Sequence, residues 1–259
     1  MGNIDLHKMI LQIENLTKTF DGLKAVKDLT LSIEKSKITS LIGPNGAGKT
    51  TVFNIITGLI KPDKGIIRYK NKDITNLNTS KIAKLGITRT FQKIRLFPQL
   101  TVLDNILLAT KYQIGEFLSA ALLKSKRMKN EEKVNIEKAL NLLEFVGLKD
   151  KKNALAEEMS HGQRRLLELA RALATDSDLL LLDEPTAGVA PEMKKKILGI
   201  IGSLKESGKT ILFIEHDMSV VNEISDKIIV MNYGEKIAEG KPSDVIKNKE
   251  VIKAYLGQE

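Results

Sequence analysis

A glycine-rich loop that ends in a lysine and a threonine is the first stretch of this sequence that could do chemistry. The segment GPNGAGKT, Gly43 to Thr50, matches the pattern G-x-x-x-x-G-K-[ST]. Its glycines let successive backbone N–H groups turn inward around an anion, and a helix N-terminus behind the loop adds partial positive charge. Lys49 can then reach the outer phosphates of a nucleotide, and Thr50 can ligate Mg²⁺. The loop predicts that the chain holds a nucleoside triphosphate through Gly43, Pro44, Asn45, Gly46, Ala47, Gly48, Lys49, Thr50 and Thr51.

Two adjacent acids follow a run of leucines further along the chain. The segment LLLLDEP, Leu179 to Pro185, predicts a buried strand that ends at Asp183. That end lies beside the phosphate loop if the two strands are neighbours, so Asp183 suits the Mg²⁺ shell. Glu184 points elsewhere because strand positions alternate, and it suits a general base that polarises the attacking water. Taken without the loop, the pair could also be two solvated acids at a strand-to-helix turn, which is the less favoured interpretation.

The hydrophobic pattern supplies the elements that must position these residues. A short buried strand, Ile38 to Ile42, runs into the loop, and a helix that Gly58 or Pro62 stops follows it. Alternating apolar residues predict half-buried strands at Ile10 to Thr17 and Leu29 to Glu34.

Later in the chain the pattern becomes helical and then alternates again. Apolar residues at three- and four-residue spacing from about Pro98 to Asp176 indicate an inserted helical lobe. A helix that opens at Pro191, a strand at Thr210 to His216, another helix and a hairpin-like pair follow. Aliphatic strands between helices predict an α/β fold whose mostly parallel sheet is covered on both faces.

Composition excludes several classes of function. The chain has no cysteine, so thiol chemistry is impossible, and no apolar stretch approaches the ~18 residues that span a bilayer. The N-terminus has no signal-peptide core. The net charge of +9 comes from lysines spread along the chain without interleaved aromatics, which favours a solvated surface over a base-stacking one. We expect a soluble chain whose membrane role, if any, comes through a partner.

A third motif decides between classes of phosphate-binding protein. In MSHGQRRLLELARAL, Met159 to Leu173, Ser160 and Gln163 are spaced as a capping box at the start of a leucine-bearing helix. That N-terminus, with Ser160 and the Gly162 N–H, is a second possible anion site. The segment also resembles the signature of the ABC ATPases, Leu-Ser-Gly-Gly-Gln, and the loop, signature and acid pair occur in that family's order.

The resemblance implies roles for further residues. Gln92 in TRTFQKIRLF matches the Q-loop glutamine, which acts in catalysis and at the metal, and His216 in FIEHDM matches the switch histidine. Phe20 in LTKTFDGLKAV matches the aromatic residue that stacks on adenine, and Val26 joins it at the nucleotide. Catalysis is thereby assigned to Glu184, His216, Gln92 and Lys49, the metal to Thr50, Gln92 and Asp183, and the partner's nucleotide to Ser160, Gly162 and Gln163.

Within that family, the sequence is most similar to the ATP-binding subunits of branched-chain amino acid importers. The similarity covers LTKTFDGLKAVKDLTLSI, TRTFQKIRLFPQLTVLDNILLA, the charged segment Phe117 to Lys133, and the ending AYLGQE. Two positions depart from the family pattern. His161 replaces a glycine of the signature, and Ala190 in GVAP stands where an aspartate often helps couple two subunits.

The resemblance also implies an architecture and partners. We expect one ABC ATPase domain with a P-loop NTPase (RecA-like) core and an antiparallel β subdomain at about 1–97 and 177–259, and a helical subdomain at about 98–176. Two copies, or this chain and a related paralogue, would pair head to tail around two ATP and Mg²⁺. They would bind transmembrane permease subunits at the cytoplasmic side of the cell membrane, as peripheral subunits, and work indirectly with a substrate-binding protein.

Three alternatives remain open at this point. The same residues would serve urea or amide import, or lipid or lipopolysaccharide export. An ABC ATPase acting on nucleic acid or ribosomes is less favoured, because the spacer between loop and signature lacks sustained heptads and the chain has one cassette, so we expect no nucleic-acid partner. A non-hydrolysing regulatory domain is disfavoured by intact Lys49, Asp183, Glu184 and His216.

Overall fold

The computed structural model describes residues 8–110 and 126–256, which form two compact units. The first unit contains Met1–Arg89, Asp178–Pro185 and Ile201–Glu259, and the second contains Thr90–Ser177 and Thr186–Ile200. The limits of the subdomains given above remain a prediction. Most of the charged segment 117–133 lies outside the described residues, which resume at 126.

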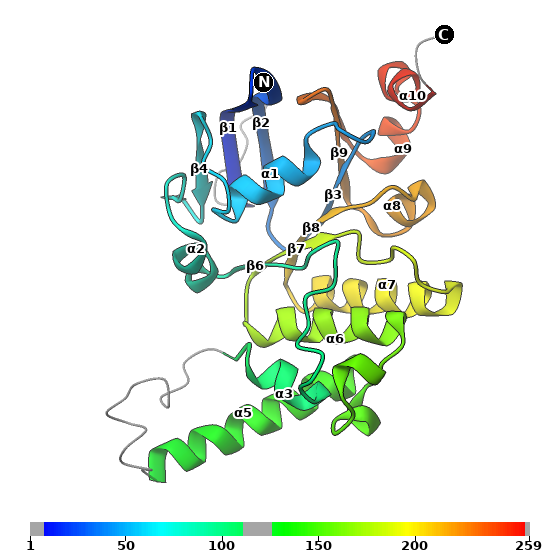
Figure 1. Cartoon of the computed structure of the whole chain (residues 1–259). Coiled ribbons are helices and arrows are strands. Elements are labelled where there is room, and N and C mark those ends of the chain that lie inside the picture. The colour runs from blue at the N-terminus through cyan, green and yellow to red at the C-terminus, as the bar shows by residue number, and fades with distance from the viewer. Residues whose placement is uncertain (1–7, 111–125, 257–259) are drawn as a thin grey trace. The chain divides into compact units, whose positions relative to one another are not determined.

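A six-stranded sheet of order β10-β9-β3-β8-β7-β6 forms the centre of the first unit. Each pair from β9 to β6 is parallel, and only β10 runs antiparallel to its neighbour β9. Strands β3, β7 and β8 are buried at every position, as their continuous aliphatic runs predict. The strands are β3 (Ile38–Ile42), β6 (Ile87–Arg89), β7 (Leu179–Asp183), β8 (Thr210–Ile214), β9 (Lys227–Asn232) and β10 (Glu235–Gly240) (Figure 1).

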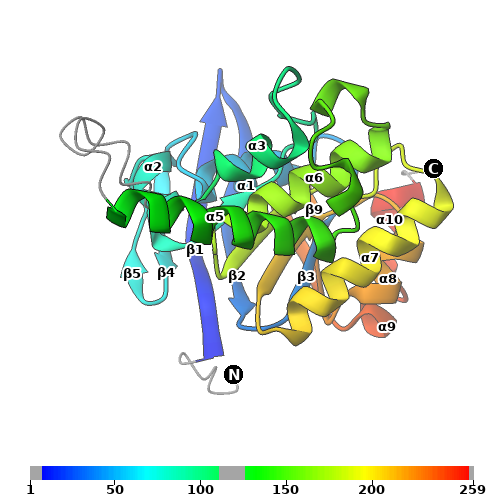
Figure 2. The same ribbon diagram turned by 90° about the horizontal axis from the view of Figure 1, so that it is seen from below.

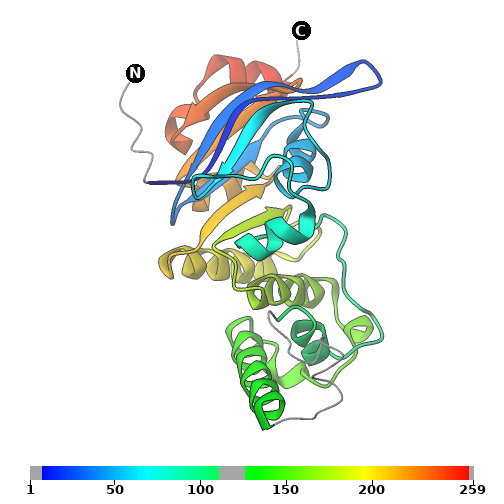
Figure 3. The same cartoon turned by 90° about the vertical axis from the view of Figure 1, so that its left-hand side faces the viewer.

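A second sheet of the same unit has the order β2-β1-β4-β5 and is antiparallel throughout. Its strands are β1 (Met9–Phe20), β2 (Leu23–Glu34), β4 (Lys64–Tyr69) and β5 (Lys72–Asp73) (Figure 3). Both strands of the long β1–β2 hairpin are longer than the apolar alternation predicted. Register shifts along β1 interrupt that alternation, so the sequence pattern does not mark the full length of the strands. The two sheets and α1 share one apolar core.

The helices of this unit are short. They are α1 (Lys49–Ile56), α2 (Thr79–Leu85), α8 (Met218–Ile224), α9 (Pro242–Val245) and α10 (Lys249–Leu256). Sequence periodicity did not predict α2, which has a single buried residue, Ile82, and is defined by its ends. Asn78 caps it by accepting a hydrogen bond from the Lys81 N–H, and Gly86 ends it at φ 107°.

The second unit is mainly helical, as predicted. It contains α3 (Val102–Leu107), α5 (Lys126–Phe145), α6 (His161–Ala174), the 3₁₀ turns Lys149–Lys151 and Ala156–Glu158, and the first part of α7 (Pro191–Glu206). Helices α3, α5 and α6 pack against one another (Figure 2). Over the described ranges of both units, we find no helix with the length and apolar character needed to cross a membrane.

Candidate functional site

The phosphate loop lies between the carboxyl end of β3 and the first turn of α1. Gly48 caps α1 at φ 99°, and a Cβ built there would be 2.3 Å from the Ala25 carbonyl oxygen of β2. At Gly43, whose φ is 147°, a Cβ would be 2.0 Å from the Met231 carbonyl oxygen of β9. The loop is therefore held so closely against β2 and β9 that only glycine fits at these two positions.

Lys49 lies across its own loop. Its buried ammonium donates hydrogen bonds to the Gly43 carbonyl at 2.7 Å and the Pro44 carbonyl at 2.9 Å. An ammonium has three N–H donors, and these carbonyls take two of them. Burial lowers the pKa of Lys49, while the nearby charges of Glu184 and Asp183 oppose that shift. The loop lysine and the acid pair thus share one electrostatic neighbourhood, although β8 lies between β3 and β7, so the two strands are not the neighbours that the sequence analysis supposed.

The two predicted acids have different environments. Asp183 is the last residue of β7 and is almost fully buried, and its Oδ2 accepts a hydrogen bond from Arg89 Nη2 at 2.6 Å. Glu184 follows in the left-handed region at φ 50°, where its N–H donates to the Ile214 carbonyl at 3.0 Å. A non-glycine residue in this region costs about 1–3 kcal/mol.

The structure brings the predicted base and the predicted switch histidine together. His216 Nε2 lies 2.5 Å from Glu184 Oε1, and the His216 N–H donates to the Glu215 carboxylate at 3.0 Å. Both residues follow neighbouring parallel strands, β7 and β8, whose carboxyl ends lie at the same sheet edge as the phosphate loop. The contact fixes the Glu184 carboxylate relative to that edge, which is what a residue orienting water requires.

The predicted adenine residues differ in accessibility. Phe20 is 40% exposed at the end of β1, with the Lys18 ammonium 5.4 Å from its ring centroid. Val26 is fully buried in the core shared by the two sheets. Phe20 therefore presents a ring face on which a base could stack, whereas the Val26 side chain does not reach the surface.

The C-terminal helix also reaches the phosphate loop, which the motifs did not predict. The phenol oxygen of Tyr255 on α10 interacts with the backbone of Gly43. Burial raises the pKa of Tyr255, and the interaction with Gly43 partly opposes that rise. A cavity of about 800 Å³ is lined by loop residues and by Glu250 and Lys253 of the same helix. The only sequence signal was the ending AYLGQE, whose spacing does not indicate a contact 200 residues away.

Ser160, Gly162, Gln163 and Gln92 lie in the second unit. The capping box is confirmed: the Ser160 N–H donates to Gln163 Oε1 at 2.9 Å, and the Gln163 N–H donates to Ser160 Oγ at 3.3 Å. Gly162 lies against Met193, since a Cβ there would be 2.7 Å from the Met193 Cγ.

Two residues of α6 hold the backbone at Gln92, and the sequence analysis missed both. Arg165 donates to the Gln92 carbonyl at 2.7 Å and the Phe91 carbonyl at 3.1 Å, and it pairs with Glu168 at 3.2 Å. Glu168 in turn accepts from the Phe91 N–H at 3.3 Å, and burial raises the pKa of Glu168. Helix α6, which Ser160 caps, thus fixes the main chain at Gln92.

The two departures from the family pattern meet in this unit. A Cβ built at Gly188, whose φ is 69°, would be 3.4 Å from the His161 imidazole. The side chain at the unusual signature position therefore lies beside the segment GVAP. The Ala190 carbonyl accepts a hydrogen bond from Lys194 at 2.9 Å in the first turn of α7.

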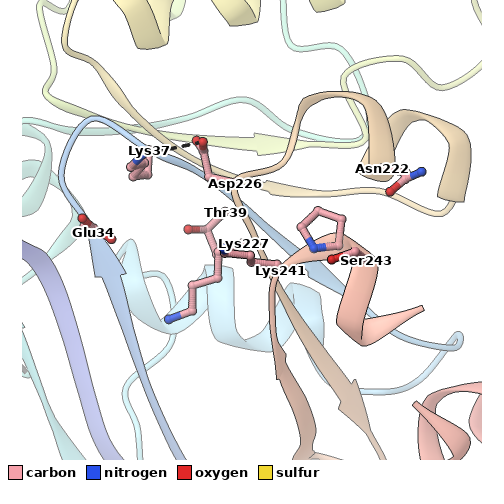
Figure 4. A pocket seen from close by; sticks show the side chains of 9 residues that line it. Glu34, Lys37, Thr39, Asn222, Asp226, Lys227, Lys241 and Ser243 are labelled. Atoms are coloured by element: carbon pink, nitrogen blue, oxygen red, sulfur yellow. Dashed lines mark ion pairs between the residues drawn. The ribbon is translucent and has the colours of Figure 1, made fainter. Parts of the chain in front are cut away.

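A further polar pocket of about 560 Å³ lies at the opposite ends of the strands (Figure 4). It opens where β3 and β9 begin, and three lysines and two acids contribute to its wall. Asp226 there accepts from the Ile38 N–H at 2.9 Å and pairs with Lys205 at 2.9 Å and Lys37 at 3.8 Å. These bonds tie the start of β3 to its neighbours. In parallel sheets ligands bind at the carboxyl ends, so we assign this pocket no part in nucleotide binding.

Comparison with known families identifies two regions of the chain. The family described as ABC transporter matches residues 26–187. A second family, described as branched-chain amino acid ATP-binding cassette transporter, matches residues 235–259, which include β10 and α10.

Curated relatives match from end to end. The chain is 41% identical over 254 residues to the high-affinity branched-chain amino acid transport ATP-binding protein BraF of Pseudomonas aeruginosa. The match covers 98% of this chain and 100% of the relative. It is 41% identical over 250 residues to LivG of Escherichia coli, described in the same words, with 96% and 98% coverage.

Solved structures give the same result for the fold. A nucleotide-free ATP-binding cassette from an ABC transporter matches with a TM-score of 0.83 at 38% identity, over 96% of this chain and all of that one. A dimeric bacterial ABC transporter cassette matches with a TM-score of 0.76 at 30% identity, over 90% and 98% of the two chains. The α/β fold class and the resemblance stated from the motifs are both confirmed, while the individual site residues remain predictions.

Proposed function

Because the chain belongs to the ATP-binding cassette family of ABC transporters, we propose that it powers the import of branched-chain amino acids by hydrolysing ATP. The observation that carries the substrate class is the full-length identity of 41% to two transport proteins of that name. The match of the C-terminal residues 235–259 to the corresponding family adds to it.

The donor set of the first unit fits ATP with Mg²⁺. The glycine loop offers inward N–H groups, Lys49 an ammonium, Thr50 a hydroxyl and Asp183 a buried carboxylate. Mg²⁺, when bound, would neutralise the negative charge that develops on the phosphates during phosphoryl transfer. Thr50 and Asp183 would hold it.

Hydrolysis needs a water molecule directed at the γ-phosphorus. The Glu184 carboxylate accepts the proton as the water oxygen bonds to phosphorus and the bond to the β-phosphate oxygen breaks, which yields ADP and phosphate. His216, 2.5 Å from that carboxylate, holds it in the orientation required. The loop carbonyls take two of the three Lys49 donors, so the third can donate to a phosphate oxygen, and a second phosphate contact would require the exchange of one carbonyl.

A second copy, or a related paralogue, completes each site. Ser160 is exposed at the capped N-terminus of α6, where its hydroxyl and the Gly162 N–H can meet the γ-phosphate held by the partner. The similarity to a dimeric cassette supports this arrangement. The pair would act on transmembrane permease subunits from the cytoplasmic side of the membrane, and a substrate-binding protein would deliver the amino acid.

The test is reconstitution with the permease subunits and the substrate-binding protein that co-purify with this chain from native membranes. We expect ATP-dependent leucine uptake into proteoliposomes, and we expect Glu184→Gln to abolish it while lengthening the lifetime of the ATP-bound dimer. Glu206→Gln, an exposed carboxylate on α7, is the matched control and should leave both unchanged. Uptake of urea in place of leucine would overturn the substrate class, and unimpaired turnover in Glu184→Gln would overturn the mechanism.

A further inference from the structure

Arg89 occupies a buried position between α1 and β7, which carry two of the predicted metal ligands, Thr50 and Asp183. It ends β6, opposite Leu181 in the parallel register with β7. Its side chain is 5% exposed, and that of Asp183 is 4% exposed. A guanidinium this deeply buried requires a partner of opposite charge.

One guanidinium makes contacts on two sides. Arg89 Nη2 donates to Asp183 Oδ2 at 2.6 Å, and Nη1 donates to Asn54 Oδ1 at 2.6 Å. Its central carbon lies 5.3 Å from the Phe53 ring centroid, so α1 also supplies an aromatic face. Asn54 comes one helical turn after Thr50 on α1. Arg89 therefore ties the helix that presents the Thr50 hydroxyl to the carboxylate of Asp183.

The charge of Arg89 bears on how Asp183 receives a metal. A buried carboxylate needs a positive partner, and Mg²⁺ reaches this site with the nucleotide. Arg89 supplies that charge whether or not a nucleotide is bound. A cation already hydrogen-bonded to the carboxylate weakens its attraction for free Mg²⁺, whereas the phosphates of a Mg²⁺–nucleotide complex offset the repulsion.

We propose that Arg89 is a positioning residue that makes Asp183 accept Mg²⁺ together with a nucleotide and not alone. The Arg89–Asp183 ion pair also lets the site hold ATP without metal, because the guanidinium weakens the repulsion between the Asp183 carboxylate and the triphosphate. The inference rests on the proposed function, since it concerns the metal of the ATP site. It assigns Arg89 no direct contact with the phosphates.

The test compares nucleotide affinities with and without metal. The dissociation constant of ATP is measured by calorimetry in excess Mg²⁺ and in EDTA, for the wild type and for Arg89→Gln, Arg89→Lys and Arg68→Gln. Gln removes the charge but can still hydrogen-bond. Lys keeps the charge but cannot bridge both partners. Arg68, exposed and paired with Glu14 at 2.5 Å on β4 and β1, is the matched control.

In Arg89→Gln we expect the ratio of the metal-free to the Mg²⁺-loaded dissociation constant to rise at least about tenfold, because a buried carboxylate then loses a hydrogen-bonded cation. Arg89→Lys and Arg68→Gln should keep the wild-type ratio. In an Asp183→Asn background, Arg89→Gln should change nothing further. An unchanged ratio in Arg89→Gln, the same rise in Arg89→Lys, or a full effect in the Asp183→Asn background would each overturn the proposal.

Thermal unfolding without nucleotide provides a second readout, and its wild-type measurement does not depend on whether the Arg89→Gln variant folds. Millimolar Mg²⁺ alone should leave the wild-type unfolding temperature unchanged, and should raise that of Arg89→Gln. A rise in the wild type that disappears in Asp183→Asn would overturn the proposal. If the wild type itself fails to bind ATP, the proposed function is wrong, whereas normal ATP binding with an unaltered ratio condemns only the role of Arg89.

Discussion

Replacing Gly48 by alanine tests whether the phosphate loop is held by the strands behind it. The new Cβ would lie 2.3 Å from the Ala25 carbonyl oxygen, which is backbone and cannot rotate away, at a φ of 99°. The backbone conformation costs about 1–3 kcal/mol, and the forced displacement costs about 1–3 kcal/mol more. For a chain of this size, each kcal/mol lowers the unfolding temperature by about 2–4 °C, so the sum corresponds to a fall of roughly 4 to 24 °C.

The assay is thermal unfolding, followed by calorimetric titration with ATP. We expect Gly48→Ala to lose stability and most of its affinity for ATP, because the N–H groups of the first turn of α1 shift away from the phosphates. Gly202→Ala on α7 is the control, since a Cβ there meets nothing within 4 Å. In a helix that substitution should gain about 0.5–1 kcal/mol. Wild-type stability and affinity in Gly48→Ala would refute the close packing of the loop.

Two further predictions concern the catalytic edge and the β1 strand. His216→Ala should lower the rate of ATP hydrolysis by roughly 10²–10⁴-fold with little change in ATP affinity, because the Glu184 carboxylate loses the side chain that orients it. Single-turnover assays measure the rate, and equilibrium binding measures the affinity. An equally large loss of affinity would contradict the role predicted for His216. The Lys18 ammonium, 2.7 Å from the Asp63 carboxylate, lowers the pKa of Asp63 in the folded chain below its usual value of 3.8. The ionised carboxylate therefore stabilises the fold at any pH above 3.8, and this stabilisation is lost as the pH falls through the lower pKa of the folded state. The unfolding temperatures of wild type and Asp63→Asn should therefore differ by a constant amount above about pH 4 and converge below it.

Local chemistry explains why the sequence predicted the loop and the signature so well. A glycine that must adopt a positive φ, or a serine that caps its own helix, leaves its mark within a few residues. The Ser160–Gln163 box and the loop from Gly43 to Thr50 are of this kind. The fully buried aliphatic strands were predicted for a similar reason, since one short run of residues carries the whole signal.

The contacts that the sequence did not predict are all long-range. Arg89 meets Asp183 across 94 residues, and Arg165 meets the Gln92 carbonyl across 73. Each contact depends on the register of strands or on the packing of helices, which no spacing rule records. The helix α2 was missed for a different reason: its seven residues bury only Ile82, so periodicity had nothing to detect.

The left-handed backbone at Glu184 has a consequence for protein engineering. Glycine or asparagine would adopt a φ of 50° with less strain than glutamate does. A screen that rewards only heat resistance would therefore favour replacements of Glu184, and each would be a more stable protein without its predicted general base. Stabilised versions of this cassette should be selected for turnover as well as for survival of heating, and position 184 should be kept fixed in any library.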